Sequence, residues 1–412
     1  MTTTKNNEHK KLNFSSEREQ SQACLNSAEH EKNQGRKVLN VPNLRFPEFQ
    51  GEWEEERLAD IADLYKGTGI SKDQLSDDGE PCILYGELYT KYKSETIREV
   101  ISKTNIDNTK LVRSKANDVI IPCSGETAED IATARCVLNG NILLGGDLNI
   151  IRLHGYDGAF MSYQLNGRRK YDIAKVAQGV SVVHLYGEHL KGVKTINPCL
   201  EEQKEIAKLL SLLDERIATQ NKIIDKLQSL IKGIAQHCIR ELINGWEYVR
   251  LGDICKITTG KLDANAQVEN GQYPFFTCAE RPFNIDSYAF DTEALLISGN
   301  GANLGYINYY KGKFNAYQRT YILDHFSVNI QYVKWALKVL LPQRIAIEKS
   351  SSNTPYIVLS TLADLKIPIP NNSKQNHIAD LMMSFERKLS TQLVLSDLYN
   401  KQKQYLLRQM FI

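Results

Sequence analysis

The chain has 412 residues, of which 42% are hydrophobic and 24% charged, a balance typical of proteins that bury a packed core. Its formal net charge of +2 neither indicates nor excludes a nucleic-acid partner, because an acidic back can balance a basic face. The sequence has no run of about 18 apolar residues and no apolar leader, so we expect a soluble protein of the cytoplasm. The eight cysteines form no CxxC pair, which favours reduced thiols over disulfides or a metal site.

The first part of the chain predicts a polar tail followed by a mixed domain. Residues 1–40 are polar and charged and predict a disordered tail. Within residues 41–200, the runs Val119–Pro122 and Leu148–Leu153 predict strands, and Arg57–Leu64 and Phe160–Leu165 predict helices. We therefore expect a first globular domain of the α+β class.

The second part repeats this plan. Residues 201–244 predict a long helix, residues 245–370 a second α+β domain, and residues 371–412 a closing helix. In the second domain, Ala294–Ile297 and Tyr321–Leu323 predict strands, and a helix is expected near Val333–Leu340.

An internal repeat supports this division. The opening segment at Trp53 (WEEERLADI) recurs at Trp246 (WEYVRLGDI), an offset of 193 positions. The segment at Gln203 (QKEIAKL) recurs at Gln375 (QNHIADL), an offset of 172. The period is too long for a solenoid, so each copy is expected to be a domain in its own right.

Apolar residues of both long helices recur in steps of three and four, which predicts a heptad seam and an antiparallel coiled coil between them. Gln220 and Gln392 take equivalent places and put a polar group into each seam, where such residues often fix register. A helix packed only on its own domain is the simpler alternative. The predicted interface consists of Ile206, Leu210, Leu213, Ile217, Gln220, Ile224, Leu227, Ile231, Ile378, Met382, Phe385, Leu389 and Gln392.

Common catalytic motifs are missing. The sequence contains no GxxxxGK[ST] phosphate loop, GxGxxG turn, HExxH helix or GxSxG elbow. It also lacks the Asn-Pro-Pro-aromatic or Asp-Pro-Pro-aromatic tetrapeptide typical of amino-methyltransferases. We therefore predict no catalytic residues, no metal and no cofactor in this chain.

Polar loops and basic clusters remain as candidates for binding DNA. Glycine-containing loops follow a predicted strand in each domain, and small polar side chains there can approach base edges or phosphates. Lysine and arginine interleaved with tyrosine can pair with phosphates, although any one such cluster is more often solvated surface. The candidates are Lys91, Lys93, Ser124, Gly125, Thr127, Arg168, Arg169, Lys170, Ser181, His184, Ser298, Asn300, Asn303, Lys311, Lys313, Gln318, Arg319, Asn353 and Tyr356.

The order of these motifs resembles the specificity subunit of type I restriction-modification systems. The resemblance covers Val41 to Ile412 and includes the two Trp-Glu openings, the exits at Leu190–Pro198 and Leu362–Pro370, and the two Gln-x-x-Ile-Ala helix starts. It implies two target-recognition domains that each read half of a bipartite double-stranded DNA target, with a coiled coil setting the spacing.

The resemblance also implies partners. Modification subunits would carry S-adenosylmethionine, and restriction subunits would use ATP and Mg, with no membrane involved. Two other readings stay open, a coiled-coil adaptor whose repeated domains bind protein partners and an enzyme with a diverged site.

Overall fold

The computed structural model describes residues 40–107, 109–179, 182–241, 246–349 and 356–412. The described residues form two compact units. The first contains the chain up to Asp214 together with Gln402–Ile412, and the second is Glu215–Lys401. Most of the predicted tail and the candidates Ser181 and Asn353 lie outside the described residues.

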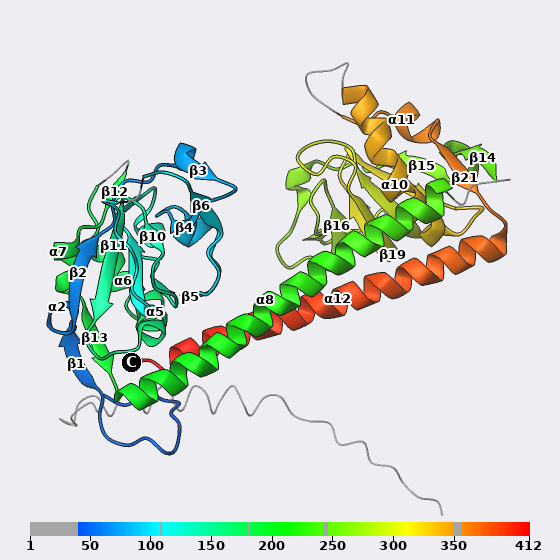
Figure 1. The fold of residues 1–412 in the computed structure, drawn as a ribbon. Coiled ribbons are helices and arrows are strands. Elements are labelled where there is room, and N and C mark those ends of the chain that lie inside the picture. The colour runs from blue at the N-terminus through cyan, green and yellow to red at the C-terminus, as the bar shows by residue number, and fades with distance from the viewer. Residues whose placement is uncertain (1–39, 108, 180–181, 242–245, 350–355) are drawn as a thin grey trace, which may run out of the picture. The chain divides into compact units, whose positions relative to one another are not determined.

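The globular part of the first unit is built from short strands and short helices (Figure 1). Its strands are β1 (Glu54–Arg57), β2 (Ala62–Lys66), β3 (Leu75–Ser76), β4 (Glu80–Ile83), β5 (Thr96–Ile97), β6 (Ser102–Thr104), β7 (Asp118–Pro122), β8 (Ser124–Gly125), β9 (Arg135–Val137), β10 (Leu143–Leu144), β11 (Leu148–Leu153), β12 (Val183–His184) and β13 (Lys194–Asn197). Its helices are α2 (Leu58–Ile61), the 3₁₀ turn η2 (Lys72–Gln74), α3 (Glu87–Thr90), α4 (Ala128–Ile131), α5 (Gly158–Asn166), α6 (Lys170–Val176) and α7 (Gly187–Lys191).

These strands form a five-stranded sheet in the order β2-β11-β7-β9-β5 and a four-stranded sheet in the order β10-β4-β6-β3. The buried run of β7, flanked by β11 and β9, explains why its sequence is apolar throughout. The rings of Trp53 and Phe160 pack edge to face 5.9 Å apart, and Phe160 also packs on Phe411 at the end of the chain.

The second unit has one larger sheet and a long helix. Its strands are β14 (Glu247–Arg250), β15 (Lys256–Thr259), β16 (Tyr273–Phe276), β17 (Phe283–Ile285), β18 (Phe290–Ser298), β19 (Ile307–Ala316), β20 (Thr320–Asp324) and β21 (Lys366–Ile369). Its helices are α9 (Leu251–Ile254), the 3₁₀ turn η4 (Ala264–Ala266), α10 (Ile330–Lys349) and α11 (Leu359–Ala363). The six-stranded sheet runs in the order β15-β20-β18-β19-β16-β17.

The sequence repeat is a structural repeat. β1 pairs with β13 in the first unit as β14 pairs with β21 in the second, both antiparallel. The neighbouring strands β2-β11-β7 correspond to β15-β20-β18, and all of these pairings are antiparallel. Trp246 packs on Tyr332 at an interplanar angle of 67°, the angle found between Trp53 and Phe160.

The repeated glutamines hold each long helix to its domain. The side chain of Gln203 donates to the carbonyl of Pro198 at 2.8 Å and accepts from the backbone N–H of Asp157 at 2.9 Å. Gln375 does the same with Pro370 at 2.8 Å and Asn329 at 3.0 Å. Asp157 and Asn329 in turn cap the first turns of α5 and α10, so one buried side chain joins three elements in both units.

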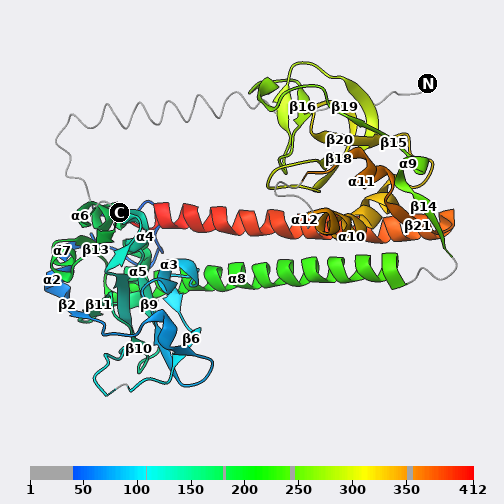
Figure 2. The same ribbon diagram turned by 90° about the horizontal axis from the view of Figure 1, so that it is seen from above.

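The two long helices are α8 (Leu200–Gln236), which continues into the π-helical turn η3 (His237–Glu241), and α12 (Asn372–Gln409). Within the second unit they run antiparallel, because Arg216 bonds to Tyr399 while the later Gln220 bonds to the earlier Gln392. Figure 2 shows α10 beside α12 in this unit. The predicted α+β repeat with an antiparallel helix pair is confirmed.

Some element predictions were wrong in detail. The helix expected over Arg57–Leu64 is only α2, because the chain turns at Ala62 into β2 and pairs with β11. The strands predicted at Val119–Pro122 and Leu148–Leu153 are β7 and β11, and the helix predicted near Val333–Leu340 lies within α10.

Candidate nucleic-acid interface

In the first unit, the fold joins the two polar loops that the sequence singles out. Ser124 and Gly125 pair with His184 and Val183 as the two-stranded sheet β8-β12. The backbone N–H of Leu185 donates to the carbonyl of Cys123 at 2.8 Å. The side chain of Asn149 on β11 donates to the carbonyl of Leu185 at 2.9 Å, so the second loop is fixed to the sheet.

The second unit makes the same junction with different side chains. The backbone N–H of Ile357 donates to the carbonyl of Gly299 at 2.9 Å. The hydroxyl of Tyr321 on β20 donates to the carbonyl of Ile357 at 2.8 Å. Tyr321 and Ile357 lie 172 positions after Asn149 and Leu185, so the repeat extends to the bonds that hold the loops.

A third predicted segment joins this junction. The backbone N–H of Gly299 donates to the carbonyl of Arg319 at 2.8 Å, which brings Gln318 and Arg319 beside the loop that begins at Ser298. Gln318 and Arg319 are exposed, and the side chain of Tyr356 is 53% exposed. Three segments distant in sequence thus present polar, cationic and aromatic groups at one end of β18.

Not every loop candidate faces solvent. Ser124 and Ser298 are 8% and 2% exposed, and the hydroxyl of Ser124 donates to Asp147 at 3.3 Å. Thr127 caps α4 by accepting from the backbone N–H of Asp130, and Asn303 donates to the carbonyl of Cys278 at 3.0 Å. These side chains shape the loops, whereas the half-buried Asn300 remains on the surface.

Sequence reasoning missed groups beside the first loop pair. A cavity of about 240 Å³ lies there, lined by Lys66, Asn149, Tyr186, Lys191 and others. The ring of Tyr186 is exposed and stacks with that of His184 at 6.0 Å. The position of Tyr186, two residues after the candidate His184, was the signal available in the sequence.

The isolated lysine candidates contact groups close to them in the fold. Lys91 pairs with Glu87 at 2.6 Å, and Lys93 donates to the carbonyl of Thr90 at 3.2 Å. Lys311 lies 3.4 Å from Glu293, and the ammonium of Lys313 lies 4.6 Å from the centre of the Tyr288 ring. The contacts of Lys93, Lys311 and Lys313 are exposed and weak, so these three lysines remain available to phosphates, whereas Lys91 is held by a carboxylate that is only 7% exposed.

Two members of the cluster Arg168-Arg169-Lys170 bond to the end of the chain. Arg168 donates to the carbonyls of Phe411 at 3.2 Å and Arg408 at 2.8 Å, and Arg169 donates to that of Ile412 at 3.4 Å. The guanidinium of Arg168 thus caps the end of α12, whose last carbonyls have no partner within the helix, and that of Arg169 bonds to the segment after it. The structure engages two members of the cluster in holding α12 against the first unit.

The positions predicted for the helix seam are buried or half-buried, and one of them is seen to bond across the helix pair. Gln220 is 5% exposed, and its amide donates to the side-chain oxygen of Gln392 at 2.8 Å. Ile217, Phe385, Leu389 and Gln392 are half-buried. The remaining predicted positions are buried, namely Ile206, Leu210, Leu213, Ile224, Leu227, Ile231, Ile378 and Met382.

The cysteines of the described residues are unpaired thiols. Burial raises the pKa of Cys82 and of Cys123 to about 11 and that of Cys255 to about 12. In the described part of the chain, no three His, Cys, Asp or Glu side chains are grouped as a metal site would need. None of its helices is long and apolar enough to span a membrane.

The fold therefore defines a class of protein in which an α+β domain with paired loops occurs twice and is carried on a pair of long helices. The chain belongs to the family described as the type I restriction modification DNA specificity domain, which matches residues 50–229 and 243–394. The resemblance inferred from the sequence is confirmed, and the adaptor alternative is not favoured.

Individual relatives agree with this assignment. The EcoDI specificity subunit of Escherichia coli is 44% identical over 135 residues, which cover 33% of this chain and only 30% of that protein. The MjaVIII specificity subunit of Methanocaldococcus jannaschii is 24% identical across 83% of this chain and 87% of its own length. A crystal structure of a type I S subunit from M. genitalium has the same fold, with a TM-score of 0.67, 19% identity, and coverage of 90% of this chain and 99% of that one.

Proposed function

We propose that this chain is the DNA-recognition subunit of a type I restriction-modification complex. Each unit reads one half of a bipartite target in double-stranded DNA, and the helix pair sets the distance between the halves. The observation that carries the proposal is the loop junction made twice, by Asn149 with Leu185 and by Tyr321 with Ile357, in a chain of the DNA specificity family.

Recognition and positioning are assigned to different groups. Exposed cations such as Arg319 and Lys313 contact phosphates, which fixes the protein on the duplex without reading sequence. Side chains such as Asn300, Gln318 and Tyr356 lie in the same loop junction as Arg319, and we assign them the directional contacts that discriminate bases. The cavity beside His184 and Tyr186 serves the first unit in the same way.

The chemistry belongs to partner subunits that act with this chain in the cytoplasm. Modification subunits bring S-adenosylmethionine and methylate the target, and restriction subunits use ATP and Mg. We assign this chain no catalytic role. We assign the first recognition domain to residues 41–200 and the second to residues 245–370.

Sequencing of methylated positions tests the proposal. A genome carrying the modification subunit is compared with and without the gene for this chain, and a bipartite methylated motif should appear only with the gene. Gln318→Ala should alter the sequence of one half-site and leave the other unchanged. A motif that is the same without this chain would refute the proposal.

A further inference from the structure

One acid on each long helix occupies the same place in the repeat, and its exposure is low: the residue on α8 is buried, and the side chain of the one on α12 is 31% exposed. Asp214 on α8 and Glu386 on α12 are 172 positions apart, the offset that relates Gln203 to Gln375. Both acids point at their own unit's globular part, and neither belongs to the loop surface described above. Their partners differ, although their places in the fold agree.

Asp214 is 8% exposed and receives donors from three elements. The hydroxyl of Tyr163 on α5 donates to its carboxylate at 2.8 Å, and the hydroxyl of Ser94, before β5, donates at 2.9 Å. The ammonium of Lys403 on α12 lies 2.6 Å from the other carboxylate oxygen. This acid thus ties the globular part of the first unit to both long helices.

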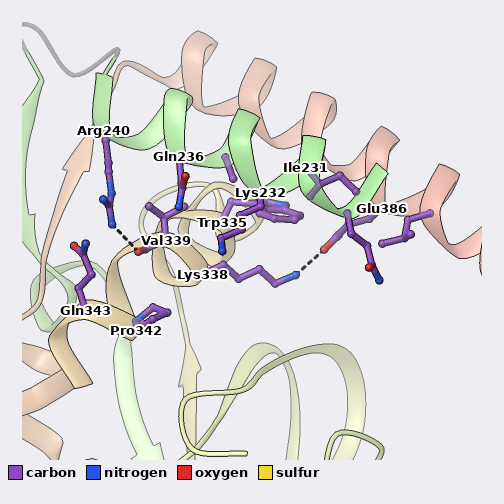
Figure 3. Close-up of a pocket in the computed structure, with 13 residues that line it drawn as sticks. Ile231, Lys232, Gln236, Arg240, Trp335, Lys338, Val339, Pro342, Gln343 and Glu386 are labelled. Carbon is purple, nitrogen blue, oxygen red and sulfur yellow. Dashed lines mark hydrogen bonds and ion pairs between the residues drawn. The ribbon is translucent and has the colours of Figure 1, made fainter. Parts of the chain in front are cut away.

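Glu386 accepts from two lysines of α10, as Figure 3 shows in part. Its carboxylate lies 2.6 Å from the ammonium of Lys334 and 2.9 Å from that of Lys338. Lys338 also lies over the ring of Trp335 at 4.2 Å, and Trp335 is the counterpart of Tyr163 at the offset of 172. Glu386 therefore ties α10 to α12 at the place where Asp214 ties α5 to α8.

The ion contacts at these two places restrict orientation in a way that apolar packing does not. The junction of each unit with its helix pair already buries large apolar side chains, including Leu210 in the first unit and Leu227 in the second. Replacing a buried ion pair by apolar side chains is often neutral or stabilising, so such a pair contributes little net stability. Directional contacts instead exclude neighbouring orientations and registers that apolar packing tolerates.

We propose that Asp214 and Glu386 are positioning residues that fix the orientation of each recognition domain on the helix pair and so hold the spacing between the two half-sites. This rests on the proposed function, in which the helix pair separates two DNA-reading surfaces. Neither acid reads bases, and both act through the orientation of the sheet that carries the loops.

The two anchors are not identical in what they restrain. Lys403 belongs to α12, so the contact at Asp214 also fixes α12 against α8. At Glu386 both cations come from α10, and the register of the helices in that unit is held separately by Gln220 and Gln392. Loss of Asp214 should therefore affect spacing more than loss of Glu386.

The test uses the full chain assembled with its modification subunits and a DNA library whose half-sites are fixed and whose spacer length varies. Asp214→Asn and Glu386→Gln keep side-chain shape and remove charge. Matched controls are Asp225→Asn on α8 and Asp380→Asn on α12, both exposed carboxylates. We expect methylation at spacers one base pair too long or too short, relative to the preferred length, to rise about tenfold in the anchor variants, which is about 1.4 kcal/mol of discrimination. The controls should match the wild type.

A second variant covers the case in which Glu386→Gln leaves Lys334 unpaired and unfolds the unit. Glu386→Met combined with Lys334→Met removes both charges and should fold, again with relaxed spacing. Unchanged spacer selectivity in the folded anchor variants would overturn the inference. If the wild-type complex shows no bipartite motif, the proposed function itself fails.

Discussion

Lys403 offers the most direct test of the buried charge cluster in the first unit. Its ammonium lies 2.5 Å from Glu95 and 2.6 Å from Asp214, and all three side chains are about nine-tenths buried. Arg135 is the other buried cation near the two acids, and it donates to the carbonyls of Ala134 and Tyr92. Lys403→Met keeps an apolar stem of similar length and leaves two buried carboxylates without their shared cation.

The expected cost at neutral pH is large. Removing one partner of a buried ion pair costs about 3–5 kcal/mol, because the remaining charge stays buried without compensation. For a unit of this size, each kilocalorie lowers the melting temperature by about 2–4 °C, so a decrease of roughly 6–20 °C is expected. Calorimetry of the full chain measures the shift on the transition of the first unit.

The pH dependence of this loss distinguishes charge burial from lost packing. Burial already raises the pKa of Glu95, and Lys403 opposes that rise, so the variant raises it further. A carboxyl whose pKa is raised on folding binds protons that the unfolded chain has released, so stability falls as pH rises above its ordinary value of 4.5. The gap between variant and wild type should therefore narrow as pH falls from 7 towards 5.

Lys401→Met is the matched control on the same helix. Lys401 pairs with Asp397 at 2.7 Å, but both side chains are more than half exposed, so its loss should change stability by less than about 0.5 kcal/mol. If Lys403→Met costs less than about 1 kcal/mol, or if its cost is the same at pH 5 and pH 7, the cluster does not carry buried uncompensated charge.

Three further predictions concern the helix pair. Gln392→Leu alone should lower the free energy of unfolding by about 1 kcal/mol, because the Gln220 amide loses its side-chain acceptor and keeps only the backbone carbonyl of residue 392 at 3.1 Å, while Gln220→Leu combined with Gln392→Leu should be nearly neutral in denaturant unfolding. Equal losses in both variants would contradict this. Arg168→Ala should lower stability by about 1 kcal/mol. It should leave the salt slope of DNA binding unchanged, whereas loss of a phosphate contact would reduce it by about 0.9. Insertion of seven residues after Leu227 and of seven before Phe385 keeps both seams and adds about 10 Å, so methylated-site sequencing should show a spacer longer by up to about three base pairs. An active complex with the original spacer would show that the helix pair does not set the distance.

The features predicted from the sequence are those encoded in short stretches of chain. Helical periodicity predicted the seam, and the repeat put Gln220 and Gln392 at equivalent places in it; the structure adds that the two side chains contact each other at 2.8 Å. The buried strand β7 was predictable because both of its faces are covered, which leaves a continuous apolar run. These signals depend on neighbours within a few residues.

The features that were missed depend on contacts between distant residues. Arg168 reads as a surface cation in its own segment, and only the end of α12, some 240 positions later, gives it carbonyls to cap. Lys403 lies among polar residues of a helix, and nothing local shows that Glu95, 308 positions earlier, will bury it. A charged side chain has the same local sequence pattern whether it ends in solvent or in a paired, buried site.

The repeat separates what must be the same in the two units from what must differ. The strand pairs at β1-β13 and β14-β21 take equivalent places, as do the bridging glutamines and the acids Asp214 and Glu386, which join a domain to the helix pair. The sheets beyond that frame differ, with β9 and β5 following β7 in the first unit and β19, β16 and β17 following β18 in the second. Two surfaces that read different half-sites need different loops, but a fixed spacing needs the same attachment at both ends. The equivalent frame and the divergent sheets are therefore what a bipartite reader of DNA requires, and an adaptor for a single repeated partner would have no reason to vary its sheets in this way.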